Sequence, residues 1–160
     1  MWLQGVPCPR SLLNELRRMK KSIAIAVSLA AALGFVASLY LPAFYFEYRE
    51  PLSGLEVLQI GWMGIFLIIE VRWFANPFFV LVVFNNIALS PARASSAIVI
   101  ILTLASICLP AMVWFNEGSG TPVTRLGIGA YIWAASLLLA SVFNCFIPRS
   151  LGGETDAPNE

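Results

Sequence analysis

The stretch SIAIAVSLAAALGFVASLYLPAFYF, residues 22–46, decides the fold predicted for this chain. It contains no charged residue, and the part from Ile23 to Leu41 is almost purely apolar. A helix that crosses the hydrocarbon layer of a membrane needs about 20 such residues. We therefore predict a transmembrane helix that begins near Ser22 and ends before Pro42.

The residues before this stretch are basic. Residues 1–21 carry a single acid, Glu15, and five cations: Arg10, Arg17, Arg18, Lys20 and Lys21. Cations gather on the cytoplasmic side of membrane helices, so we expect a cytoplasmic N-terminus. Met19 is followed by a sequence typical of a bacterial start, which leaves Met1 and Met19 open as the first residue. A cleaved signal peptide is the alternative to an uncleaved anchor, but the apolar run exceeds the usual length of about 7–15 residues.

Composition favours a membrane protein over a soluble one. Of 160 residues, 59% are hydrophobic and 12% are charged, whereas soluble domains carry about 25% charged residues. The net charge of +1 gives no field that would attract nucleic acid. Histidine is absent, and the three cysteines are widely spaced, so no catalytic, cofactor-binding or metal-ligating pattern is present. We therefore expect a protein that is not an enzyme and needs no cofactor.

Further apolar segments predict an all-α membrane protein. They divide the chain into a basic tail (1–21), a helical membrane domain (22–148) and a disordered acidic tail (149–160). We expect four transmembrane helices plus one membrane-associated or re-entrant helix, with five transmembrane helices as the alternative. After residues 22–41, the predicted helices cover approximately residues 55–74, 77–89, 91–115 and 126–147. The segment 55–74 is the ambiguous one, because charges lie close to both of its ends.

Polar residues near the membrane are the candidate functional residues, because ionisable groups are costly at that depth. Glu56, Gln59 and Glu70 form a narrow polar stripe on segment 55–74, and Arg72 follows them. The alternative is that these side chains lie at the level of the lipid headgroups. Asn85 and Asn86 lie in a short apolar helix, and we expect at least one to face protein and to bond to another helix.

One row of small residues predicts a helix-packing surface. Ala26, Ala30, Gly34 and Ser38 recur at every fourth position of the first helix. Small side chains allow another helix to approach closely in a membrane.

Four short motifs resemble a family of small uncharacterised bacterial inner-membrane proteins. The motifs are Gly61-Trp62, Trp73-Phe74-Ala75-Asn76-Pro77, Asn116-Glu117-Gly118 and Gly127-x-Gly129-x-Tyr131-x-Trp133. The family pattern is GW…WxANP…NEGxGTxPVT…GxYxW, and the likeness covers residues 20–147. The resemblance implies a bacterial cytoplasmic membrane and brings no known activity.

These observations predict a non-catalytic membrane protein that acts through helix–helix contacts, such as an accessory subunit, an immunity-type protein or an envelope protein. Its expected partners are the lipid bilayer and either further copies of itself or another membrane protein. The alternative function is a small oligomeric transporter or channel.

Overall fold

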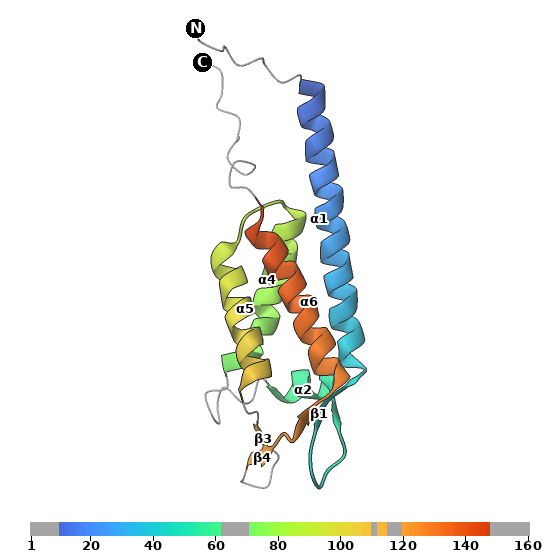
Figure 1. Cartoon of the computed structure of the whole chain (residues 1–160), viewed down its shortest axis with the longest axis vertical. Helices are drawn as coiled ribbons and strands as arrows, with labels where there is room; N and C mark the ends of the chain where they lie inside the picture. The colour runs from blue at the N-terminus through green and yellow to red at the C-terminus, as the bar shows by residue number, and fades with distance from the viewer. Residues whose placement is uncertain (1–9, 62–70, 110–111, 115–119, 148–160) are drawn as a thin grey trace.

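The computed structural model describes residues 10–61, 71–109, 112–114 and 120–147. Long helices lie side by side over most of the molecule, and short strands gather at one end (Figure 1). The elements are α1 (Arg10–Leu39), β1 (Pro42–Tyr45), β2 (Leu52–Ser53), α2 (Gly54–Gly61), the 3-10 helix η1 (Val71–Phe74), α4 (Ala75–Ile87), α5 (Arg93–Cys108), β3 (Met112–Trp114), β4 (Gly120–Pro122), β5 (Arg125–Leu126) and α6 (Ile128–Cys145).

The prediction of four transmembrane helices, and its alternative of five, is wrong. Among the described residues, only two helices are both long and apolar enough to cross a membrane: Asn14–Leu39 within α1, and α6. The 13 residues of α4 and the 16 of α5 reach about 20 Å and 24 Å, less than the roughly 30 Å of a hydrocarbon core. Length and hydropathy alone are also met by the core helix of a soluble protein or by a signal sequence.

The fold is also not all-α. An antiparallel sheet in the order β2-β1-β5 joins the end of α1 to the start of α6, and β3 pairs with β4 as a separate hairpin. β4 lies between the predicted helices 91–115 and 126–147, and β3 lies within the first of them. Pro42 starts β1 because proline cannot donate the next helical hydrogen bond.

The predicted helix over 55–74 is seen only at its two ends. α2 covers its first residues and η1 covers its last four, while the predicted centre, residues 62–70, lies outside the described part of the chain. The segment is therefore interrupted by a 3-10 turn before α4 begins at Ala75.

Prolines set the helix ends differently from the prediction. α5 ends at Cys108 and not near Phe115, because Leu109, the residue before Pro110, takes an extended conformation with φ −101° and ψ 146°. In the structure α4 and α5 begin after Phe74 and Ala92, and neither start has a side-chain cap.

The centre of the bundle is built from small side chains. α1 packs against α6, and Ala31, Leu137 and Ala140 are fully buried between the helices. Val82 of α4 and Val99 of α5 complete this core. Phe35 stacks on Phe79, with ring centroids 5.2 Å apart, and so joins α1 to α4.

Candidate functional site

Three polar side chains meet inside one end of the bundle. The Asn144 amide nitrogen donates to Asn86 Oδ1 at 2.7 Å and to the Ser90 carbonyl at 3.2 Å. Asn144 Oδ1 accepts from the Ala92 backbone N–H at 2.7 Å and from the Ser96 hydroxyl at 3.1 Å. The Asn86 amide nitrogen donates to the Ala140 carbonyl at 3.0 Å. This Asn86–Ser96–Asn144 cluster therefore joins α4, the α4–α5 turn, α5 and α6.

The cluster is a closed structural contact. Asn86, Ser96 and Asn144 are all fully buried, and a buried amide left without partners would cost about 1–3 kcal/mol. Here the amide nitrogens of both asparagines and both of their oxygens have partners. Asn86 makes the kind of interhelical bond expected from the sequence, whereas Asn85 bonds only to the Leu81 carbonyl of its own helix.

Sequence reasoning missed Asn144 and Ser96. Asn144 was available as a signal, because it is an amide within an otherwise apolar run that ends at Ile147. Ser96 carries no such signal, since a serine in the first turns of a helix is common. Only the packing of α5 against α6 brings the two together.

At the other end of the bundle, two tryptophans and an asparagine form a chain of hydrogen bonds. The Trp133 indole N–H donates to Asn76 Oδ1 at 2.9 Å, and the Asn76 amide donates to the Trp73 carbonyl at 2.9 Å. The Trp73 indole N–H donates to the Leu58 carbonyl at 3.0 Å. A Cβ at Gly61 would collide with the Trp73 ring. Residues from three of the four sequence motifs therefore meet in one chain of contacts that links α2, η1, α4 and α6.

Glycines of the last motif allow the start of α6 to approach the end of α1. A Cβ at Gly129 would lie 2.7 Å from the Leu41 carbonyl oxygen, and one at Gly127 would collide with that of Pro42. The Gly127 N–H donates to the Ala43 carbonyl at 2.7 Å. Glycine is therefore required at both positions, because the neighbouring backbone leaves no room for a Cβ atom.

Glu56 caps a helix. The backbone N–H and the hydroxyl of Ser53 each donate to Glu56 Oε2 at 2.7 Å, and the Glu56 N–H lies 3.3 Å from the Ser53 hydroxyl oxygen. This reciprocal pair is a capping box at the start of α2. The bonds from the Ser53 N–H and then from its hydroxyl hold the pKa of Glu56 below its ordinary value of 4.5. The carboxylate is exposed, so its place is at the surface of the bundle.

The other residues of the predicted polar stripe do not gather around Glu56. Gln59 is exposed on α2, and Glu70 lies outside the described residues. Arg72 is half-buried in η1, and its guanidinium lies 3.5 Å from the Leu109 carbonyl. The described part of the stripe therefore provides a helix cap and a link to the end of α5.

The residues of the predicted packing row on α1 lie partly against the bundle and partly on its surface. Gly34 and Ser38 lie in the contact with the bundle: a Cβ at Gly34 would collide with the Ser136 hydroxyl, and Ser38 is buried. Ala26 and Ala30 are exposed. Positions spaced by four residues drift by about 40° per step around a helix. The N-terminal half of the row, Ala26 and Ala30, therefore turns away from α6. The buried face of α1 consists instead of Ala24, Ser28, Ala31 and Ser38.

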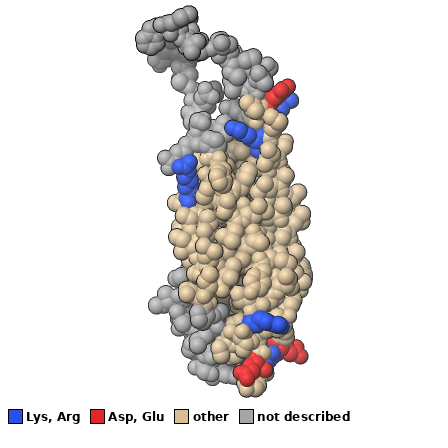
Figure 2. All heavy atoms as spheres, in the orientation of Figure 1, with Lys and Arg blue, Asp and Glu red and all other residues tan. Residues whose placement is uncertain are grey.

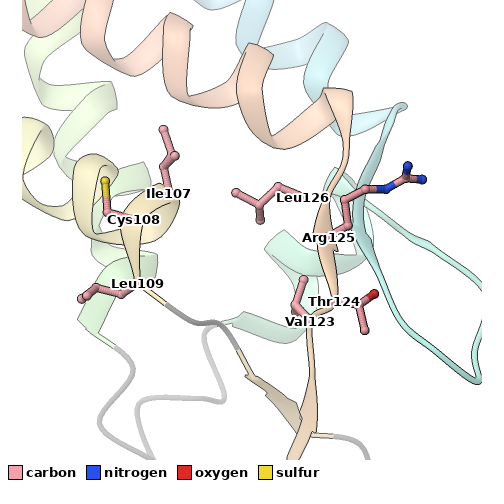
Figure 3. Close-up of a pocket in the computed structure, with 7 residues that line it drawn as sticks. All are labelled: Ile107, Cys108, Leu109, Val123, Thr124, Arg125 and Leu126. Carbon is pink, nitrogen blue, oxygen red and sulfur yellow. The ribbon is translucent and has the colours of Figure 1, made fainter.

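The surface has a hollow at the strand end. Seven residues line a space of about 220 Å³ between the end of α5 and the segment before α6: Ile107, Cys108, Leu109, Val123, Thr124, Arg125 and Leu126 (Figure 3). Its polar side chains point elsewhere. The Arg125 guanidinium lies over the Tyr45 ring at 4.3 Å, and the Thr124 hydroxyl donates to the Tyr45 carbonyl at 2.9 Å. The lining of the hollow is about half polar and half apolar, and the Arg125 and Thr124 side chains are engaged with Tyr45.

Charged side chains lie at the two ends of the face drawn in Figure 2. This face shows basic and acidic side chains at both ends of the bundle, with a broad belt between them that shows none. The belt is covered by large apolar side chains, including Leu33 (61% exposed), Ile101 (65%) and Phe84 (66%). Within the described residues, no group of His, Cys, Asp and Glu is arranged to hold a metal ion.

No protein-family profile, curated protein or solved structure matches this chain.

Proposed function

We propose that the chain is an integral membrane protein, with α1 and α6 crossing the bilayer and the uncharged belt lying in the hydrocarbon layer. The distribution of side chains carries this proposal. Leu33, Ile101 and Phe84 point outward, whereas Asn86 and Asn144 are fully buried. In water this arrangement would expose a large apolar surface, which soluble monomers rarely do. In lipid the same arrangement is favourable, because the polar side chains lie inside the protein and only apolar side chains contact the hydrocarbon.

The lengths of the two crossing helices support the same proposal. The 18 residues of α6 rise about 27 Å, and the 26 residues Asn14–Leu39 rise about 39 Å. Both are close to or above the thickness of a hydrocarbon core, about 30 Å. Aromatic side chains at the strand end of α1, Tyr40 and Tyr45, suit the boundary between membrane and water.

The charges of the two ends support a cytoplasmic N-terminus. One end of the bundle contains the start of α1 and the start of α5. Its described cations are Arg18, Lys20, Lys21 and Arg93. At the strand end, three cations, Arg49, Arg72 and Arg125, are accompanied by the acids Glu47, Glu50 and Glu56. The excess of cations at the first end favours the cytoplasmic side. The motif resemblance adds a bacterial inner membrane to the proposal.

Membrane fractionation tests integration directly. The full chain, expressed in a bacterium, is expected in the membrane fraction and is expected to stay there after washing with alkaline carbonate and with high salt. Detergent should release it. Recovery in the soluble fraction, or release by salt alone, would contradict the proposal.

Within the membrane, we propose that the protein works by helix–helix contact and has no catalytic role. The side chains of Asn86, Ser96 and Asn144 are engaged with one another and with backbone groups, and Glu56 caps α2. Ala26 and Ala30 are exposed on α1 and leave room for another helix. The alternative, an oligomeric transporter or channel, has less support because Asn86 and Asn144 are fully buried and bond to each other.

Partner capture in mild detergent tests this role. Tagged protein is expected to co-purify with a stoichiometric partner or to form a defined homo-oligomer. Ala30→Leu should weaken that complex, because the larger side chain blocks close approach. Ala97→Leu is the matched control, since Ala97 is an exposed alanine on α5. A strictly monomeric protein, or equal effects of both substitutions, would contradict the role proposed for α1.

A further inference from the structure

The first part of α1 stands clear of the rest of the bundle. From Asn14 to Ile23 every side chain that the structure describes is exposed, and Ala24 is the first buried residue of the helix. Figure 1 shows this part of α1 extending past the ends of its neighbours. Nothing in the described fold therefore accounts for its sequence, which combines basic and apolar residues.

The cations of this part occupy a narrow axial range. Arg17, Arg18, Lys20 and Lys21 fall within five consecutive residues of one helix, and four steps along a helix rise about 6 Å. The uncharged stretch begins directly after them, at Ser22. If the hydrocarbon layer starts there, as the proposed membrane location requires, the four residues lie within the headgroup layer, which is roughly 5–8 Å thick on each side.

A further cation belongs to the same end of the bundle. Arg93 is the first residue of α5 and is exposed. The α4–α5 turn precedes Arg93 and lies at the same end of the bundle as the first half of α1 (Figure 1). The only acid between Arg10 and Lys21 is Glu15, so the segment has five cations against one anion.

We propose that Arg18, Lys20, Lys21 and Arg93 form a cationic collar that binds the headgroups of anionic phospholipids. Lipid is the partner that fits, because Arg18, Lys20 and Lys21 precede the uncharged stretch directly and, in the proposed membrane location, lie at the depth of the lipid phosphates. Lys and Arg at this depth attract anionic lipid. This inference rests on the proposed membrane location and adds a lipid preference to it.

Lipid selectivity of the full chain provides the test. The protein is reconstituted in nanodiscs that contain phosphatidylcholine with a minority of phosphatidylglycerol. The lipids that remain bound are then counted by native mass spectrometry. We expect phosphatidylglycerol to be enriched at least about threefold over its share of the bulk lipid, because Lys and Arg near a membrane surface attract anionic lipid. High salt should lower the enrichment, because it screens exposed charges.

Two variants decide the assignment. Replacing the four collar cations, Arg18, Lys20, Lys21 and Arg93, by Gln should abolish the enrichment, whereas Arg49→Gln with Arg125→Gln, at the strand end, should leave it nearly unchanged. Equal lipid retention by wild type and the four-cation variant would overturn the proposal, as would enrichment that follows the strand-end variant. Failure to enter nanodiscs at all would instead contradict the proposed membrane location. Release of bound nucleic acid or protein in place of lipid would assign the collar to another partner.

Discussion

Asn85 and Asn86 show how one step along a helix separates two roles. Asn86 is fully buried and bonds to α6, whereas Asn85 is half-buried and bonds to its own helix. Adjacent helical positions point about 100° apart, so the two amides face different surroundings. Their chemistry is identical, and they therefore form a matched pair for mutation.

We predict that Asn86→Ala lowers the free energy of unfolding by about 2 kcal/mol. The change removes bonds to Ala140 and Asn144 and leaves the buried Asn144 amide without a main partner. Asn85→Ala should change stability by less than about 0.5 kcal/mol. Reversible unfolding in mixed micelles measures both values. Equal effects at the two positions would show that the buried cluster does not stabilise the fold.

Glu56 gives a pH-dependent prediction at the same scale. Its pKa lies below 4.5 because Ser53 donates two hydrogen bonds to the charged carboxylate. The resulting stabilisation of the start of α2 is therefore present above about pH 4.5 and is lost as the pH falls through the lowered pKa of the folded state. A carboxyl NMR titration should show the low pKa, and Ser53→Ala should raise it. Glu56→Gln should remove this acid dependence while Glu47→Gln keeps it.

At the scale of elements, the antiparallel contact of α1 with α6 depends on small residues. Ala24, Ser28 and Ala31 of α1 are buried at intervals of four and three residues. This spacing follows one face of a helix, whereas a row of strict four-residue steps turns around it. The buried face therefore differs from the predicted row, although both consist of Ala, Gly and Ser.

Two glycines of this contact should respond differently to alanine. At Gly129 the added Cβ meets the backbone oxygens of Leu41 and Pro42, at 2.7 and 3.0 Å, and backbone cannot rotate away. We expect Gly129→Ala to destabilise the protein by about 1–3 kcal/mol. At Gly34 the added Cβ meets the Ser136 side chain, whose hydroxyl can rotate away by giving up its bond to the Ile132 carbonyl. Alanine favours the helix by up to about 1 kcal/mol, which offsets this loss.

The net effect of Gly34→Ala should therefore lie within about 1 kcal/mol of zero. Unfolding of the two variants under one condition makes the comparison. A loss at Gly34 as large as that at Gly129 would mean that α1 and α6 cannot adjust their side chains at this contact.

For the whole molecule, the separation of charges predicts a fixed orientation in the membrane. Ala94 is exposed at the cationic end, and Glu50 is exposed at the strand end. In a background without Cys8, Cys108 and Cys145, we expect Glu50→Cys to react with an impermeant maleimide in intact spheroplasts. Ala94→Cys should react only after permeabilisation. The reverse pattern would place the N-terminus outside, and reaction at neither site before permeabilisation would place both ends in the cytoplasm.

The sequence by itself determined the apolar character of α1 and α6, the basic start of α1 and the helical class of most of the bundle. These properties depend on local composition and on residues adjacent in the chain. The tertiary structure decided the rest. It placed Asn144 beside Asn86 and Ser96 and brought Trp133 to Asn76. Such contacts join residues about fifty positions apart, and which helix faces meet depends on how whole helices pack, a property that no local pattern contains.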